Sequence, residues 1–205
     1  MSVDFVPNVG GCLSLSPPGV NVPIMKLHKT KQKGFTLIEL MITVFVVAIL
    51  ASLAAPSMSA MLAKRSVEAA SDAFVSDLRL ARSEAVKRST RVVICASTNG
   101  TSCFGTGGTW KDGWIVYVPS AANGNFASGD EIVKVQDAFP SIASIADTDG
   151  TSRFRFIFEA TGWAKSSSQT FVVTPSGVAS GATRLICVSN NGRAGIKPQG
   201  TTTCN

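Results

Sequence analysis

The stretch Lys33-Gly34-Phe35-Thr36-Leu37-Ile38-Glu39-Leu40 runs without a break into an apolar segment that extends from Met41 to Ala55. Between Phe35 and Ala55 the only ionisable side chain is that of Glu39. A run of about twenty apolar residues is the length that an α-helix needs to cross the hydrocarbon core of a bilayer. Because lipid offers the backbone no hydrogen-bond partners, residues 35–55 predict a single membrane-spanning helix.

Glu39 is the exception within this apolar run. An acidic side chain inside a spanning segment costs on the order of 3 kcal/mol on insertion scales, so it indicates a functional site whose partner has to be named. A second interpretation is that Glu39, close to the start of the run, reaches the membrane interface.

The residues from Lys33 to Leu40 resemble the class III signal of type IV pilins and type II secretion pseudopilins. The resemblance implies that a prepilin peptidase cleaves between Gly34 and Phe35, and that Phe35 becomes N-methylated. It also implies that Glu39 pairs, during assembly, with the free amine at the first residue of a neighbouring subunit. A buried carboxylate is tolerated when an opposite charge satisfies it, so the physical chemistry agrees with this implication.

Residues 1–34 are therefore expected to be a leader peptide. This segment holds four lysines and one aspartate, so it carries three of the six net positive charges of the chain. The positive-inside rule then predicts a single-pass protein of the bacterial inner membrane, with its amino terminus in the cytoplasm and its domain in the periplasm. Met25 begins a short basic leader, whereas residues 1–24 lack periodicity, so a start at Met1 or at Met25 stays open.

Residues 56–90 are expected to continue the helix as an amphipathic segment. Pro56 removes one backbone donor and would kink the helix. Apolar residues then recur at spacings of three and four, which predicts one long helix whose second half packs on a domain. The apolar stripe consists of Met58, Met61, Leu62, Val67, Ala70, Phe74, Leu78, Ala81 and Ala85. The opposite, polar face holds Lys64, Glu68, Asp72, Asp77 and Arg82.

Positive charge gathers where this helix ends, at Arg79, Arg82, Lys87, Arg88 and Arg91. Cations suit the carboxyl end of a helix, where backbone carbonyls lack partners. We interpret the cluster first as helix-end stabilisation, with a patch for nucleic acid or another anion as the alternative.

From residue 91 onward the hydrophobic period changes to two, and the breaks are rich in Gly, Asn, Ser and Asp. Strands that follow a helix predict an antiparallel α+β domain over residues 91–205, with the helix on one face of the sheet. The expected strands are Arg91–Cys95, Gly113–Val118, Glu131–Val135, Ser152–Phe158, Thr170–Thr174 and Thr183–Val188.

Within this region, the residues from Trp110 to Tyr117 resemble a motif of the GspH/FimT minor pilins and pseudopilins, and Thr161-Gly162 is similar to that group. The resemblance implies a structural subunit that helps to initiate or cap a type IV pilus or a type II secretion pseudopilus. The partners that it implies are other pilins or pseudopilins, the prepilin peptidase and the inner-membrane assembly platform. The choice between pilus and secretion machine stays open.

The cysteines indicate an oxidising compartment. Cys12 falls in the leader, and the remaining four can pair in three ways. We favour Cys95 with Cys103 and Cys187 with Cys204, because each bond would close a local loop. A zinc site is the competing use, but the spacing lacks a close Cys-x-x-Cys pair.

Nothing in the sequence indicates an enzyme, a cofactor or a metal site. The only histidine, His28, lies in the leader, and no nucleophile elbow or phosphate-binding glycine loop replaces it. The residues from Asp147 to Gly150 form a fragment of a calcium-loop pattern without its later acid, so we expect a turn before a strand.

The tail contains a second candidate site. Some members of the FimT branch carry a Gly-Arg-x-Arg tail that is implicated in binding DNA during natural transformation. Gly192 and Arg193 match this pattern, but Gly195 stands at the position of the second arginine and Lys197 follows two residues later. A disulfide-closed loop could present Arg193 and Lys197 to the phosphates of double-stranded DNA, with Arg184 nearby on its strand. The alternative interpretation is an exposed polar loop.

Overall fold

The computed structural model describes residues 34–105, 109–149, 153–165, 168–177 and 182–204, without the side chains of residues 53–56. The expected leader up to Lys33, with Cys12 and His28, lies outside the described residues. The chain divides into two compact units, Met1–Thr43 and Val44–Asn205.

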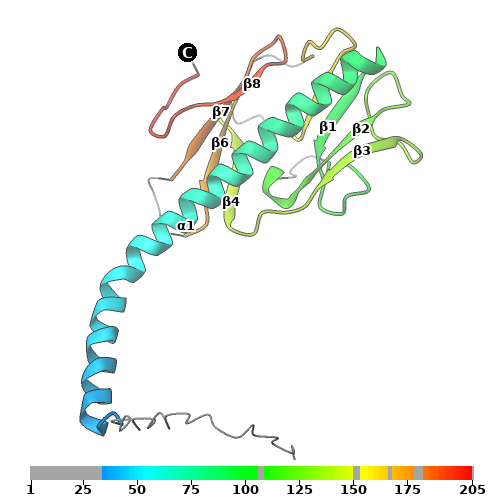
Figure 1. Cartoon of the computed structure of the whole chain (residues 1–205). Coiled ribbons are helices and arrows are strands. Elements are labelled where there is room, and N and C mark those ends of the chain that lie inside the picture. Colours follow the sequence, from blue (N-terminus) through cyan, green and yellow to red (C-terminus); the bar gives the residue numbers. More distant parts are fainter. Residues whose placement is uncertain (1–33, 106–108, 150–152, 166–167, 178–181, 205) are drawn as a thin grey trace, which may run out of the picture. The chain divides into compact units, whose positions relative to one another are not determined.

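One helix, α1, extends from Leu37 to Arg88 (Figure 1). Thr36 caps its start, because its Oγ1 accepts a hydrogen bond from the backbone N–H of Glu39 at 3.3 Å. A threonine in this place satisfies one of the amides that the first turn leaves unpaired. No single helix among the described residues is long and apolar enough to cross a membrane, but the segments Leu37–Ser52 and Ser57–Arg88 together have a suitable length and composition.

The carboxyl end of α1 closes with two backbone hydrogen bonds. The Ser89 N–H donates to the Val86 carbonyl and the Thr90 N–H to the Ala85 carbonyl, each at 3.2 Å. Ser89 has a φ of 51°, so the chain turns there through the left-handed region, as in a Schellman motif. Helix formation therefore ends at Arg88, two residues before the expected boundary.

Within the described residues, the strands form two four-stranded sheets instead of the single sheet expected from the sequence. The first sheet has the order β3-β2-β1-β5 and the second the order β4-β6-β7-β8, and every pairing is antiparallel. The elements after α1 are β1 Val92–Ala96, the 3₁₀ turn η1 Trp110–Asp112, β2 Trp114–Val118, β3 Glu131–Gln136, β4 Ile142–Asp147, β5 Arg155–Phe158, β6 Gln169–Pro175, β7 Arg184–Val188 and β8 Ala194–Ile196.

Two of these strands, β4 and β8, were not expected. In β4 the buried residues Ile142 and Ile145 are three apart, because the register shifts between Ile142 and Ser144, so the strand lacks a period of two. In β8 the residues Ala194 and Gly195 have low strand propensity, so the strand forms because it pairs with β7. After β4, the Asp147 carboxylate accepts a hydrogen bond from the Asp149 N–H at 2.7 Å, which makes the expected turn; Gly150 lies outside the described residues.

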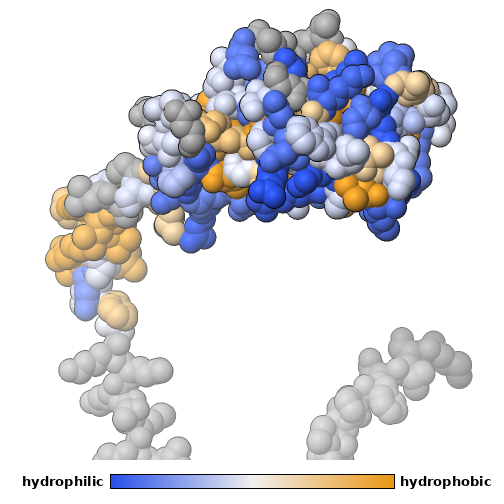
Figure 2. Space-filling model, turned by 90° about the horizontal axis from the view of Figure 1, so that it is seen from above, coloured by the Kyte–Doolittle hydropathy of each residue, from blue (hydrophilic) through white to orange (hydrophobic). Residues whose placement is uncertain are grey.

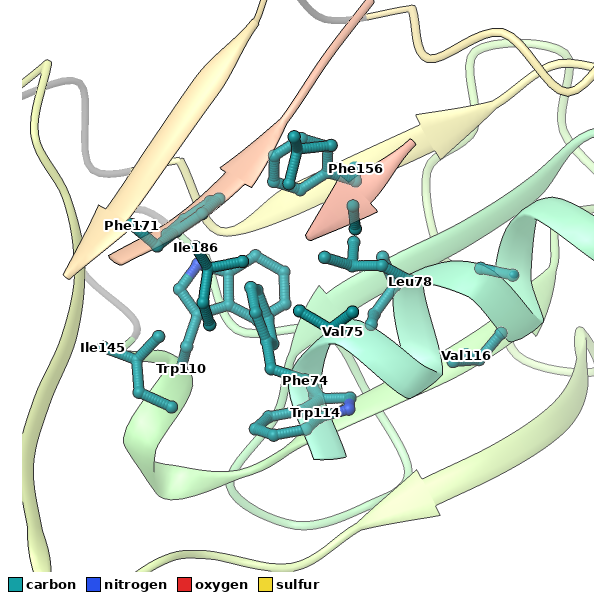
Figure 3. Packing of buried hydrophobic residues seen from close by; sticks show 14 of the residues in the cluster. Phe74, Val75, Leu78, Trp110, Trp114, Val116, Ile145, Phe156, Phe171 and Ile186 are labelled. Carbon is teal, nitrogen blue, oxygen red and sulfur yellow. The ribbon is translucent and has the colours of Figure 1, made fainter. Parts of the chain in front are cut away.

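The main core lies between α1 and both sheets. Phe74 is its centre: its ring meets those of Trp110, Trp114 and Phe171 edge-on, at centroid distances of 5.0, 5.2 and 5.2 Å (Figure 3). Such edge-to-face pairs add to the stabilisation that burial gives. The α+β fold expected from the sequence is confirmed, with the helix across two sheets.

The packed stripe of α1 is shorter than the sequence predicts. The residues Val67, Ala70, Phe74, Leu78, Ala81 and Ala85 are fully buried. The prediction is wrong for Met58, Met61 and Leu62, which are exposed. Periodicity shows that one face of a helix is apolar, but it does not show how far along the helix the sheets extend.

Asp77 corrects the expected polar face of α1. Its side chain is 1% exposed, accepts a hydrogen bond from Trp114 Nε1 at 2.9 Å and forms an ion pair with Lys134. Buried carboxylates are stable when hydrogen bonds and an opposite charge satisfy them. Asp77 therefore fastens the helix to the first sheet.

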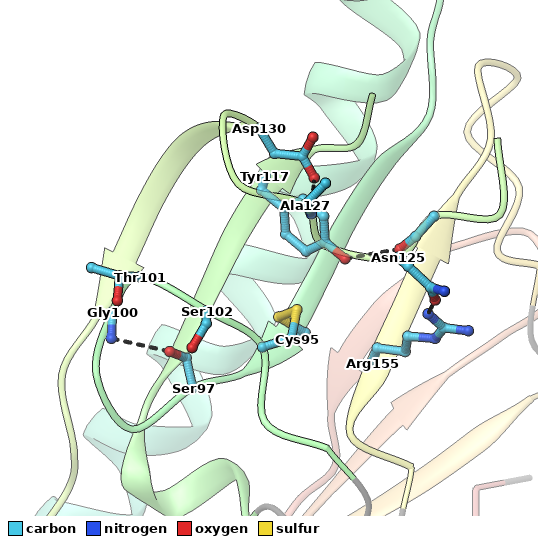
Figure 4. The surroundings of a disulfide bond; sticks show 12 residues. Cys95, Ser97, Gly100, Thr101, Ser102, Tyr117, Asn125, Ala127, Asp130 and Arg155 are labelled. Atoms are coloured by element: carbon cyan, nitrogen blue, oxygen red, sulfur yellow. Dashed lines mark hydrogen bonds between the residues drawn. A yellow bond between two sulfur atoms is a disulfide. The ribbon is translucent and has the colours of Figure 1, made fainter. Parts of the chain in front are cut away.

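A second apolar cluster covers the other face of the first sheet, around the Cys95–Cys103 disulfide (Figure 4). Tyr117 is fully buried in it and donates a hydrogen bond to the Gly124 carbonyl at 2.8 Å. Burial raises the pKa of Tyr117 to about 12, and the nearby charge of Arg155 opposes this change.

Candidate functional site

The residues expected to direct processing and assembly lie at the start of α1. Gly34 and Phe35 precede the helix, and the Phe35 side chain is 81% exposed. Glu39 is exposed in the first turn of α1, where its N–H bonds to Thr36. The apolar residues that follow are also exposed, and Figure 2 shows them gathered on this part of the chain. An exposed apolar surface of this extent indicates burial against lipid or protein.

A groove on the globular unit gathers several of the basic residues. It has a volume of about 590 Å³ and lies between the last turns of α1 and the turn that leads into β8. We call it the basic groove. Its lining residues are Arg79, Arg82, Ser83, Val86, Lys87, Gly192, Arg193 and Ala194.

Backbone carbonyls hold two of the arginines of the basic groove. Arg79 donates from Nε and Nη2 to the Ala194 carbonyl, at 3.3 and 3.1 Å. Arg82 donates from Nε to the Gly162 carbonyl at 3.1 Å. Both contacts also join α1 to distant parts of the chain, so the guanidinium groups have fixed positions at the surface.

Gly192 allows the turn before β8 to approach the turn that holds Gly162, beside the Arg82 side chain of α1. Its φ is 74°, and a Cβ atom there would lie 2.4 Å from the Gly162 carbonyl oxygen and 3.2 Å from Cδ of Arg82. A side chain at this position would therefore collide with backbone.

The basic residues near the end of α1 fall into two groups. In the first group, acidic partners neutralise the charge: Arg88 pairs with Glu84 at 2.6 Å and Glu131 at 2.7 Å, and Arg91 pairs with Glu159 at 2.9 Å. Hydrogen bonds from Arg88 lower the pKa of the Glu84 and Glu131 carboxyls. This group therefore has a structural role through acidic side chains, which differs from the expected role at the helix-end carbonyls.

The second group lines the basic groove. Arg79 and Arg82 bond only to backbone carbonyls in the described part of the chain, and no ion pair of Arg193 is found there. Lys87 makes one contact, to Glu84 at 3.4 Å, and its side chain is 76% exposed. Among the described residues, none that lines the groove is acidic.

The structure does not bring the three predicted DNA-binding residues together. Arg193 lines the basic groove, whereas Arg184 pairs with Glu68 at 2.7 Å. Arg184 and Lys197 line a different hollow of about 420 Å³, together with Glu68 and Asp72. The sequence did not indicate that Arg193 would lie beside the arginines of α1, because the two segments are more than a hundred residues apart.

Both disulfides are formed with the favoured pairing. Cys95 bonds to Cys103 and Cys187 to Cys204, with Cα separations of 5.6 and 5.7 Å. The second bond holds the tail against β7, where the Lys197 N–H also donates to the Leu185 carbonyl at 2.9 Å. A search of the described residues for groups of three or more His, Cys, Asp or Glu that could bind a metal finds none.

Two family models match the chain. The model described as type II transport protein GspH matches residues 70–192, and that of the prokaryotic N-terminal methylation motif matches residues 29–55. The first covers more than half of the chain. No match was found among curated protein sequences.

Solved structures share the fold. The type IV minor pilin FimU of Pseudomonas aeruginosa PAO1 is 21% identical, with a TM-score of 0.50 over 64% of this chain and 88% of that chain. A second crystal form of FimU is 20% identical, with a TM-score of 0.49 over 64% and 92% of the two chains. The minor pseudopilin EpsH of the Vibrio cholerae type 2 secretion system is 11% identical, with a TM-score of 0.46 over 66% and 98%. The FimU match supports a pilin fold, and the GspH model, which covers more than half of the chain, shows the family. This chain therefore belongs to the GspH family of the type IV pilin and type II secretion pseudopilin superfamily.

Proposed function

We propose that this protein is a minor pilin or pseudopilin that enters a filament through residues 35–55 and helps to initiate or cap its assembly. The observation that carries the proposal is the exposed apolar surface of the first half of α1, which has a single carboxylate, Glu39, directly after the cleavage signal at Gly34 and Phe35. In a filament, neighbouring helices would cover that surface.

The proposal assigns a role to each segment. Residues 1–34 form the leader that the prepilin peptidase removes, residues 35–55 anchor the protein in the inner membrane and later in the filament core, and residues 56–90 join this anchor to the periplasmic domain of residues 91–205. Glu39 pairs with the methylated amine of Phe35 in a neighbouring subunit. The inner-membrane assembly platform and the other filament subunits are the partners.

The test must separate a role of Glu39 in charge pairing from a role in capping α1, because Thr36 and Glu39 resemble a capping box. Glu39→Gln keeps a residue suited to the third helical position but removes the charge. Thr36→Ala removes the cap and keeps the charge. The amount of each variant is measured by immunoblot in membranes and in filaments sheared from the native host.

A charge-pairing role predicts that Glu39→Gln reaches the membrane normally but is lost from filaments at least about tenfold, as expected when a desolvated charge is left without its partner. Thr36→Ala is expected to incorporate almost normally. Normal incorporation of Glu39→Gln would contradict the pairing role.

The second candidate function is a pilus-associated subunit that binds double-stranded DNA for uptake. The observation in its favour is that Arg193 lies among the cations of the basic groove. The position of Arg184 and Lys197 beside Glu68 and Asp72 does not support a site made of all three predicted residues.

A titration of the full chain in detergent with duplex DNA, at low and moderate salt, tests this candidate. Phosphate contacts by Arg193 and Lys197 predict salt-sensitive binding that Arg193→Ala/Lys197→Ala removes. Binding that is absent, or that does not depend on these residues, would leave the assembly role alone.

A further inference from the structure

We infer that the basic groove is a docking site for an acidic segment of a neighbouring filament subunit. This inference rests on the proposed filament role and adds to it a surface on the globular domain and the chemistry of the partner that the surface accepts.

The charge of the basic groove is unbalanced. Acidic residues neutralise Arg88, Arg91 and Arg184, whereas no ion pair of Arg79, Arg82 or Arg193 is found among the described residues. The fourth cation, Lys87, shares Glu84 with Arg88. Like charges held close together raise the free energy of the isolated domain. A carboxylate of a partner would remove this repulsion.

The guanidinium groups of Arg79 and Arg82 in the basic groove have a fixed orientation. The Ala194 carbonyl holds Arg79 and the Gly162 carbonyl holds Arg82, but a guanidinium has more N–H donors than these bonds use. The donors that remain are held in place before any partner arrives, which reduces the entropy lost on binding. Their planar geometry suits a bidentate contact with a carboxylate.

The basic groove also offers apolar surface. Val86, which lines it, is 50% exposed. A side chain that has an aliphatic stem and a terminal carboxylate matches this combination.

The same features favour an acidic protein segment over duplex DNA. Duplex recognition relies on cations spread along the phosphate backbone, whereas these four surround a single hollow of about 590 Å³. The other basic residues near the end of α1, Arg88 and Arg91, are paired with Glu84 and Glu159. The surface next to the groove is therefore of mixed charge.

Photocrosslinking in assembled filaments tests the inference. Ser83 lines the basic groove, is exposed and carries no charge, so p-benzoylphenylalanine is placed there in the full chain and expressed in the native host. Crosslinked peptides from sheared filaments are identified by mass spectrometry. The comparison variants are Arg193→Glu, Arg193→Gln and Arg155→Glu; Arg155 bonds to Asn125 and lines a different hollow.

We expect a crosslink to an acidic peptide of another filament subunit. Loss of one charged contact lowers affinity by about tenfold or more, so Arg193→Glu should reduce the crosslink at least that much. Arg193→Gln should have an intermediate effect and Arg155→Glu almost none.

Three results would overturn the inference: no crosslink in filaments that contain the chain, a crosslink that Arg193→Glu does not change, or a crosslink to DNA only. Failure of the proposed function is distinguishable from these, because the unsubstituted chain would then be missing from the filaments. Arg193 is exposed, so its replacement leaves the core intact.

Discussion

Gly192 should be the least replaceable glycine in the turn that borders the basic groove. An alanine at its φ of 74° costs about 1 kcal/mol or more, because the left-handed region is unfavourable for residues with a Cβ. Its Cβ would also lie 2.4 Å from the Gly162 carbonyl oxygen, and a backbone shift to relieve such a contact costs on the order of 1–3 kcal/mol. We therefore expect Gly192→Ala to lower the free energy of unfolding by about 3 kcal/mol.

Two other glycines of the tail provide matched controls. Gly200 has a φ of 84°, but a Cβ atom there would have no neighbour within 4 Å, so Gly200→Ala should cost only the conformational term, about 1 kcal/mol. Gly195 has neither a left-handed φ nor a close neighbour, so Gly195→Ala should stay within about 0.5 kcal/mol of the original protein.

The assay is urea unfolding of the unreduced full chain in a mild detergent. Tryptophan fluorescence reports on the core, because Trp110 and Trp114 are buried there. The three variants should follow the order Gly195→Ala, Gly200→Ala, Gly192→Ala. Equal losses for Gly200→Ala and Gly192→Ala would refute the close approach of Gly192 to the Gly162 carbonyl.

Other predictions concern the core and the tail. Tyr117 is the only tyrosine, so tyrosinate absorbance at high pH reports on it alone, and it should ionise near pH 12. Because folding raises its pKa from 10.0, the unfolded chain loses this proton first as the pH rises, and the free energy of unfolding should fall by about 2 kcal/mol between pH 10 and 12. Ionisation near pH 10 in the folded protein would contradict its burial. Asp77→Ala leaves Trp114 Nε1 without its acceptor and should cost about 2–3 kcal/mol in urea unfolding, whereas a neutral effect would argue against this contact. Replacing Cys187 and Cys204 by serine should cost about 3 kcal/mol, and an unchanged unfolding midpoint would show that the bond does not constrain the unfolded chain.

The order of the elements was readable from the sequence because hydrophobic period and turn residues are local signals. The helix of period 3.6 and the strands of period two are found close to their expected positions. The division into two sheets was not readable, since it depends on which strands pair. The bulge of β4 hid the period of that strand, and β8 depends on its neighbour β7.

The burial of Asp77 was predictable from its spacing in the sequence but not from its polar residue type. Asp77 lies three residues after Phe74 and four before Ala81, which places it on the apolar stripe of α1. Its polar type suggested the opposite face, although a buried carboxylate with partners fits the stripe.

The basic groove could be predicted only in part. The sequence showed that Arg79, Arg82 and Lys87 gather at the end of the helix, and that Arg193 lies in the tail. It did not show which arginines have acidic partners, because Glu131 and Glu159 reach Arg88 and Arg91 from other elements. Tertiary structure shows which arginines face the groove without an acidic partner.

The central claim is that this chain is processed after Gly34 and built into a filament. The most direct test is the intact mass of the protein, with sequencing of its first peptide, from sheared filaments and from membranes of cells with an active prepilin peptidase. The account predicts a filament fraction that contains the chain beginning at N-methylated Phe35. An uncut chain, or a processed chain found only in the membrane, would contradict it.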